Sequence, residues 1–175
     1  SRHFDTFRVR WNTTRHWTAD MEAEQGRVAN GPDLLSGRTY RVTQQGLKPR
    51  VTWQPNTSIR AMASFKFTDK ENQTEYGGER ARIEDFGAEF RYNTAGKGRI
   101  LVTANRGAIQ YGGEVNSPVG NELLAGLKPG TNITWSVGIQ RNLNNNLQVD
   151  LTYNGRRSEG VPMVHVGAAQ VSAFF

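Results

Sequence analysis

Residues 58–68 read SIRAMASFKFT and alternate strictly between apolar and polar side chains. The odd-numbered positions carry the apolar residues Ile59, Ala61, Ala63, Phe65 and Phe67. The even-numbered positions carry Arg60, Met62, Ser64 and Lys66. A period of two places alternate side chains on opposite faces of an extended chain, so this stretch predicts a β-strand with one apolar face and one polar face.

The same alternation returns along the whole chain. It is clearest in residues 7–12, 17–24, 47–53, 86–92, 133–140 and 147–154. With the stretch at residues 58–68, the less regular one at residues 100–111 and the end of the chain, these segments predict about nine strands, most of ~10 residues or more, joined as an antiparallel meander. The only helical pattern is one or two turns in residues 120–127, inside a loop.

Two strands break the alternation. Tyr40 and Val42 have the opposite parity to Leu47 and its apolar neighbours, which predicts a bulge near residues 44–46. Arg106 shares the parity of the apolar residues before it, which predicts either a second bulge or a membrane boundary.

Composition excludes several classes of protein. Only 36% of the residues are hydrophobic, the mean hydropathy is -0.65 and there is no cysteine, so thiolate metal sites and cysteine nucleophiles are excluded. No stretch approaches ~18 consecutive apolar residues, which excludes a transmembrane helix. A membrane β-barrel stays open, because its strands are apolar on one face only.

Strand length and connection length favour that barrel. Strands of ~9–11 residues suffice to cross a bilayer when tilted. Short connections at residues 12–15, 55–57, 93–98 and 141–146 alternate with long polar ones at residues 26–37, 69–80, 111–130 and 154–163. This is the outer-membrane barrel pattern, so the long connections are expected to be extracellular and the short turns periplasmic.

The polar parity is rich in charges of both signs. A dry core could not hold them without a large desolvation cost, so they are predicted to line a water-filled lumen. They are Arg8, Arg10, Asp20, Glu22, Glu24, Lys48, Arg50, Arg60, Lys66, Glu89, Arg91 and Asp150.

The tryptophans are predicted to form an interfacial girdle. An indole ring packs apolar surface while its N–H reaches the wet interface. All of them are expected next to short turns, on the periplasmic side: Trp11, Trp17, Trp53 and Trp135.

The chain ends on an apolar alternation that finishes with an aromatic residue. Ala169, Val171, Ala173 and Phe175 share one parity. This ending resembles the C-terminal signature of bacterial outer-membrane barrels, and the resemblance implies recognition by the barrel-assembly machinery. Phe174 has the other parity and is expected to point into the periplasmic mouth.

A second resemblance covers residues 76–175. The segments DFGAEFRYN, LLAGLKPGTNITWSV and NNLQVDLTYNGRRS, followed by VHVGAAQVSAFF, resemble the C-terminal region of large Bacteroidetes-type outer-membrane barrel proteins. The resemblance implies a location in the bacterial outer membrane and carries no catalytic residues.

The expected architecture is therefore all-β, an antiparallel up-and-down transmembrane barrel without an internal domain boundary across residues 1–175. Bacterial barrels have an even number of strands, so about nine strands predict the C-terminal part of a larger barrel. A miscount of one strand would make it a closed eight-stranded barrel.

The expected function is a pore or transport component, or a membrane-assembly or secretion subunit, and not an enzyme. The lipid bilayer, the assembly machinery and other outer-membrane or lipoprotein subunits are the expected partners. No cofactor and no metal are predicted, since no cluster has metal-ligand spacing. Nucleic acid is not an expected partner, because an open sheet that bound it would leave its apolar face uncovered.

Two alternatives remain open at this point. A soluble lipocalin-like barrel would turn the apolar face inward around an apolar ligand. An outer-membrane hydrolase would need His165 close to Asp150 or Ser158.

Overall fold

The structure is a computed structural model that describes residues 1–31, 39–124, 128–144 and 146–173. The strands are β1 (Arg2–Asn12), β2 (Trp17–Asn30), β3 (Tyr40–Trp53), β4 (Ile59–Asn72), β5 (Arg80–Thr94), β6 (Gly98–Gly112), β7 (Gly130–Asn144), β8 (Leu147–Ser158) and β9 (Val164–Ala173). The helices are the single 3-10 turn η2 (Thr74–Tyr76) and the short α1 (Pro118–Leu124). No helix among the described residues is long and apolar enough to cross a membrane.

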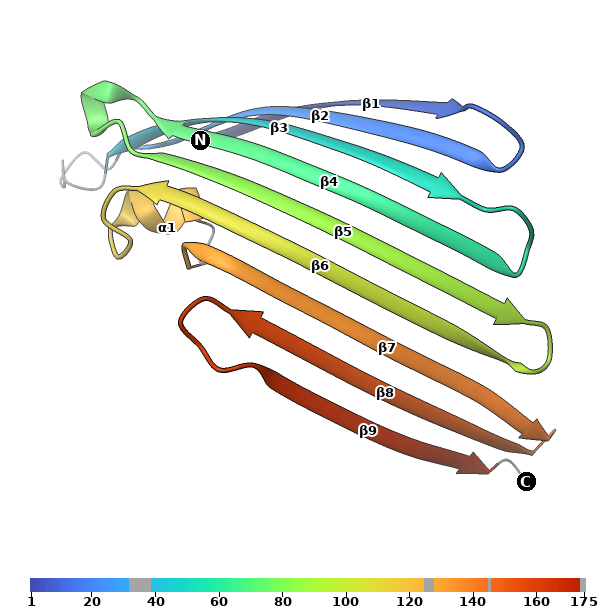
Figure 1. The fold of residues 1–175 in the computed structure, drawn as a ribbon. Helices are drawn as coiled ribbons and strands as arrows, with labels where there is room; N and C mark the ends of the chain where they lie inside the picture. The colour runs from blue at the N-terminus through green and yellow to red at the C-terminus, as the bar shows by residue number, and fades with distance from the viewer. Residues whose placement is uncertain (32–38, 125–127, 145, 174–175) are drawn as a thin grey trace.

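The nine strands form one antiparallel sheet in sequence order (Figure 1). This confirms the all-β, up-and-down prediction. The sheet is open: within the described part of the chain, β1 and β9 each pair with one neighbour only. Both run from the end with the long connections to the end with the short turns, so direct pairing of β1 with β9 would be parallel.

Short turns and long connections lie at opposite ends of the sheet (Figure 1). The short turns follow β1, β3, β5 and β7, and the last described residue of β9 lies at the same end. We call this the short-turn end and the other the long-connection end. In the β5–β6 turn, a Cβ on Gly98 would lie 2.2 Å from the Gln140 carbonyl oxygen, which explains the glycine there.

The strands are longer than the apolar alternation predicts. They contain 10 to 15 residues, and residues 26–30, 69–72 and 154–158, expected in connections, belong to strands. Backbone pairing continues past the point where the outward side chains become polar, because the hydrogen bonds do not depend on an apolar face.

Neither predicted bulge is present. The β2–β3 register runs without a shift from Trp17–Trp53 to Asn30–Tyr40, and β6 pairs with β5 and β7 without a shift at Arg106. The strand continues without a bulge, and the apolar side chains of Tyr40 and Val42 therefore point to the face opposite that of Leu47. A register shift does occur in the β7–β8 pair, between Asn142 and Asn144.

The buried core lies at the long-connection end, between the sheet and α1. Two neighbouring clusters are formed by Val28, Tyr40, Val42, Ala81, Val119 and Leu123 and by Ile83, Ile109 and Leu124. The helix begins at Pro118, whose fixed φ suits a first turn, and Ser117 Oγ accepts a hydrogen bond of 2.9 Å from the Gly120 N–H. The helical pattern in residues 120–127 is thus confirmed as far as Leu124.

Candidate functional site: the two faces of the sheet

The register sorts the side chains onto two unlike faces. Residues directly opposite one another on paired strands point to the same side, so the continuous pairing of Phe7 with Ala23, Leu47 and Phe67 defines an apolar face. The apolar residues of the alternating segments predicted from the sequence lie on this face. The opposite side, the charged face, carries Arg8, Arg10, Asp20, Glu22, Glu24, Lys48, Arg50, Arg60, Lys66, Glu89, Arg91 and Asp150.

The two faces differ in how far their side chains are exposed to solvent. Phe7 and Trp11 on the apolar face are 68% and 67% exposed. Arg8 and Arg10, on the charged face of the same edge strand, are as exposed, at 64% and 65%. On the interior strand β5 the faces differ: Phe86 and Phe90 on the apolar face are 50% and 41% exposed, and the side chains of Glu89 and Arg91 on the charged face are 23% and 36% exposed. The buried hydrophobic side chains of the strands also lie on the charged face, around α1. The charged face is therefore the more sheltered side of the sheet, and the apolar face lies open.

The apolar side chains form a band with a sharp border toward the long-connection end. On β4 the outward residues are apolar throughout Ile59–Phe67, and the next two are Asp69 and Glu71. On β5 the border falls at Glu84, and Arg80 forms an ion pair with Asp69 just beyond it. The apolar run from Ile59 to Phe67 is about 26 Å along the strand, or about 20 Å in height at the ~40° tilt of a membrane-barrel strand.

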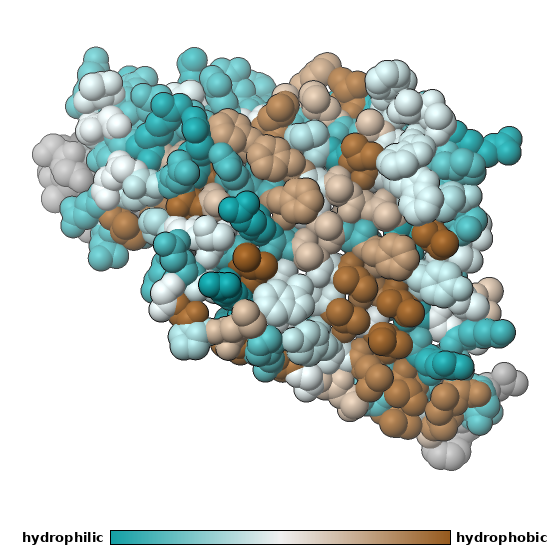
Figure 2. All heavy atoms as spheres, viewed as in Figure 1, coloured by the Kyte–Doolittle hydropathy of each residue, from teal (hydrophilic) through white to brown (hydrophobic). Residues whose placement is uncertain are grey.

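Space-filling shows the same division (Figure 2). Apolar side chains gather across the middle and lower right of this view, and hydrophilic ones cluster at the left, over the long-connection end. A membrane barrel carries an outward apolar band ≈ 25 Å tall. With the tilt of a barrel strand, the apolar run of β4 approaches that height.

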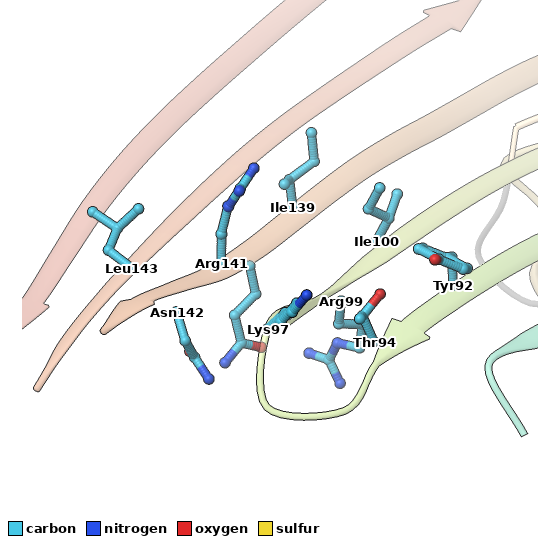
Figure 3. A pocket seen from close by; sticks show the side chains of 11 residues that line it. Tyr92, Thr94, Lys97, Arg99, Ile100, Ile139, Arg141, Asn142 and Leu143 are labelled. Atoms are coloured by element: carbon cyan, nitrogen blue, oxygen red, sulfur yellow. The ribbon is translucent and has the colours of Figure 1, made fainter. Parts of the chain in front are cut away.

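The band also ends at the short turns. There a hollow of about 490 Å³ opens beside the β5–β6 turn and the end of β7 (Figure 3). Tyr92, Ile100, Ile139 and Leu143 are its apolar lining, and Lys97 and Arg141 add cationic side chains. Apolar and cationic side chains therefore meet in this hollow.

Three of the predicted girdle tryptophans lie beside short turns. Trp11 is near the end of β1, Trp17 begins β2 and Trp53 ends β3. The rings of Trp17 and Trp53 have centroids 6.2 Å apart.

The prediction for Trp135 is wrong. It is closer to the first residue of β7 than to the short turn that follows β7. Its ring lies over Gly155, where a Cβ would come within 2.1 Å of Trp135 Cε2, and edge-on to His165 at 6.0 Å between centroids. Tyr153 completes this second aromatic cluster, with its hydroxyl 2.7 Å from His165 Nδ1. The aromatic residues therefore border the band toward both ends.

The candidate hydrolase group does not come together. His165 lies on the apolar face, opposite Gly155, and Asp150 and Ser158 lie on the charged face. The sheet itself separates the imidazole from both side chains. The sequence could not distinguish these sides without the register.

Ion pairs on the charged face form mainly between β1 and β2. Arg8 pairs with Glu22, and Arg10 Nε lies 2.6 Å from Asp20 Oδ1. On β5, Arg91 Nη2 lies 3.1 Å from Glu89 Oε1. These pairs use Asp20, Glu22 and Glu89. Of the other described carboxylates on this face, Glu24 and Asp150 accept hydrogen bonds from Gln44 and Gln148, and Asp85 lies opposite Lys66.

Helix α1 covers the long-connection end of the charged face. Glu122 is its polar anchor: its Oε2 accepts hydrogen bonds from Arg2 Nη2 at 3.0 Å and from the Tyr40 hydroxyl at 3.2 Å. Lys70, which lies beyond the apolar band, donates to the Glu122 carbonyl oxygen at 3.4 Å. Burial beneath the helix lowers the pKa of the Lys70 ammonium.

Sequence reasoning missed this contact between α1 and the sheet. A signal was present: Val28, Val42, Ile83 and Ile109 are apolar residues in the polar parity, each close to a long connection. Apolar residues on a charged face need cover, and α1 supplies it.

The described part of the C-terminal motif lies on an edge strand. Ala169, Val171 and Ala173 point to the apolar face of β9, which has a paired neighbour only in β8. Val171 is 65% exposed. Phe174 and Phe175 lie outside the described residues.

Comparison with known proteins adds no relative to this description. No family model matches the chain, and no match to a curated protein was found.

Proposed function

We propose that the chain is an integral component of a bacterial outer-membrane β-barrel, with the apolar face toward lipid and the charged face lining a water-filled passage for solutes. The observation that carries the proposal is the exposed apolar band, Ile59–Phe67 on β4, on the opposite side of the sheet from a more sheltered charged face. Removing such a band from water is worth about 25 cal/mol per Å².

The shelter of the two faces favours this orientation over a soluble ligand-binding barrel. A lipocalin-like barrel would enclose the apolar side chains. Here, on the interior strand β5, Glu89 and Arg91 are more sheltered than Phe86 and Phe90. Charges of both signs on the inner side need water, which a passage provides and a dry cavity does not.

The unpaired edges support a barrel made of more strands than these nine. β1 and β9 run in the same direction, and bacterial single-chain barrels pair all their strands antiparallel. We propose that additional strands, odd in number, pair with both edges. Other outer-membrane or lipoprotein subunits are candidate partners at the long-connection end.

The same edge fits recognition by the barrel-assembly machinery. An exposed strand offers its free N–H and C=O groups to an incoming strand, and the side chains of one face supply specificity. In this proposal β9 and its apolar row of Ala169, Val171 and Ala173 serve as the assembly signal.

Ionic current tests the pore proposal. The complete gene product, purified from membranes in detergent, is expected to insert into planar bilayers and to give discrete, reproducible conductance steps. Heat-denatured protein at the same detergent concentration is the control. A protein that stays monomeric in water without detergent and gives no steps would contradict the proposal.

A further inference from the structure

Two arginines face each other on the charged face. Arg60 of β4 is directly opposite Arg91 of β5, and directly opposite residues have Cβ atoms ≈ 4.5–5.5 Å apart. Like charges in this position repel and destabilise the strand pair. Such a pair is therefore expected to meet a compensating negative charge.

The arginines also hold buried donors without an acceptor. Among the described residues, the Nε atoms of Arg50, Arg60 and Arg91 are buried and make no hydrogen bond. Arg91 uses only Nη2 toward Glu89. A buried N–H without a partner costs free energy, and an ion at the site is one of the explanations for it.

Of these three arginines, Arg91 is paired with Glu89, and the carboxylates nearest Arg50 are hydrogen-bonded mainly to arginines of β1. Asp20, directly opposite Arg50, is hydrogen-bonded to Arg10, and Glu22 is hydrogen-bonded to Arg8. Within the described residues, neither Arg50 nor Arg60 forms an ion pair.

We propose that Arg60 and Arg91 bind a small oxyanion of the phosphate class on the charged face, with Arg50 as a further contact along β3. The proposal rests on the proposed function, since it names what the passage accepts. Guanidinium groups match tetrahedral oxyanions because their N–H donors form a planar fork. Arg50 is opposite Ser64, four residues along β4 from Arg60, or about 13 Å. An anion can thus move between guanidinium groups along the face.

Calorimetric titration with inorganic phosphate tests the site. The full protein in detergent micelles is expected to bind phosphate saturably, and Arg60→Gln with Arg91→Gln is expected to weaken binding by about tenfold or more. The matched control is Arg106→Gln with Arg157→Gln, which removes the same charge from the opposite face and is expected to bind as the wild type does. Arg60→Lys keeps the charge without the fork and is expected to fall between them.

The site and the pore proposal fail in different ways. The anion site would be contradicted if the protein formed pores but did not bind phosphate saturably. It would also be contradicted if both double variants lost phosphate binding equally. Neither result would contradict the pore proposal. Saturable binding by a protein that never enters a bilayer would overturn the pore and leave the site. Gel mobility before and after heating checks that each variant is folded, and removing the Arg60–Arg91 repulsion is expected to favour folding.

Discussion

A lysine in place of Ala63 is expected to destabilise the inserted sheet by about 2–4 kcal/mol, the cost of a cation on the lipid face near the middle of a bilayer. Ala63 lies in the middle of the apolar band, paired with Val51 on one side and Ala88 on the other. An ammonium there must leave water or pull its strand toward the interface.

The matched control is the preceding residue in the chain. Met62 lies on the charged face, opposite Thr52 and Glu89, where water and a carboxylate receive the new charge. Met62→Lys is expected to cost less than about 1 kcal/mol. Urea unfolding in lipid vesicles measures both variants, and equal destabilisation by the two lysines would contradict the assignment of the faces.

A lysine in place of Ala169 is expected to reduce the amount of assembled barrel in the outer membrane by about tenfold, the factor that corresponds to 1.4 kcal/mol. Ala169 belongs to the apolar row of β9, opposite Leu151. In the proposal this row has two roles in assembly: the assembly machinery recognises it on an edge strand, and it forms part of the face that contacts lipid.

The neighbouring alanine makes the comparison stringent. Ala168 is opposite Thr152 on the charged face, so Ala168→Lys makes the same chemical change one residue away and is expected to assemble normally. Heat-modifiable mobility of the protein in isolated outer membranes measures the assembled fraction. Normal assembly of Ala169→Lys would contradict the proposal that the apolar row of β9 serves as the assembly signal.

The architecture of the sheet was predictable because one local rule operates in every strand. A period of two shows which residues share a face, and a meander needs no information beyond neighbouring pairs, so the alternation predicted the two faces and the order of the strands. The bulge predicted near residues 44–46 and the bulge alternative at Arg106 were wrong for one physical reason, and the membrane-boundary alternative at Arg106 stays a prediction. Tyr40, Val42 and Arg106 lie where the strands extend past the apolar band, and there the apolar side changes or disappears while pairing continues.

Contacts between segments far apart in the sequence could not be read the same way. Glu122 meets Arg2 and Tyr40 only because α1 folds back over the charged face. The distance of Trp135 from its short turn depends on where β7 ends, at Asn144, and a polar turn sequence does not define that residue. The Arg60–Arg91 pairing needs the β4–β5 register, which parity alone does not determine.

The central claim is that lipid contacts one face of the strands and water the other. Site-directed spin labelling of Ile59–Phe67 in the complete, reconstituted protein tests it most directly, because these residues cross the whole band and the chain contains no cysteine that would compete for the label. Each residue is replaced in turn by a labelled cysteine. Accessibility to oxygen, which concentrates in lipid, and to a water-soluble nickel complex is then measured.

The account predicts two alternating patterns with a period of two and opposite phase. Oxygen accessibility should peak at odd-numbered residues such as Ala63 and Phe65, and nickel accessibility at even-numbered residues such as Arg60 and Ser64. The same phase for both probes, or high nickel accessibility at Ala63 and Phe65, would contradict the account.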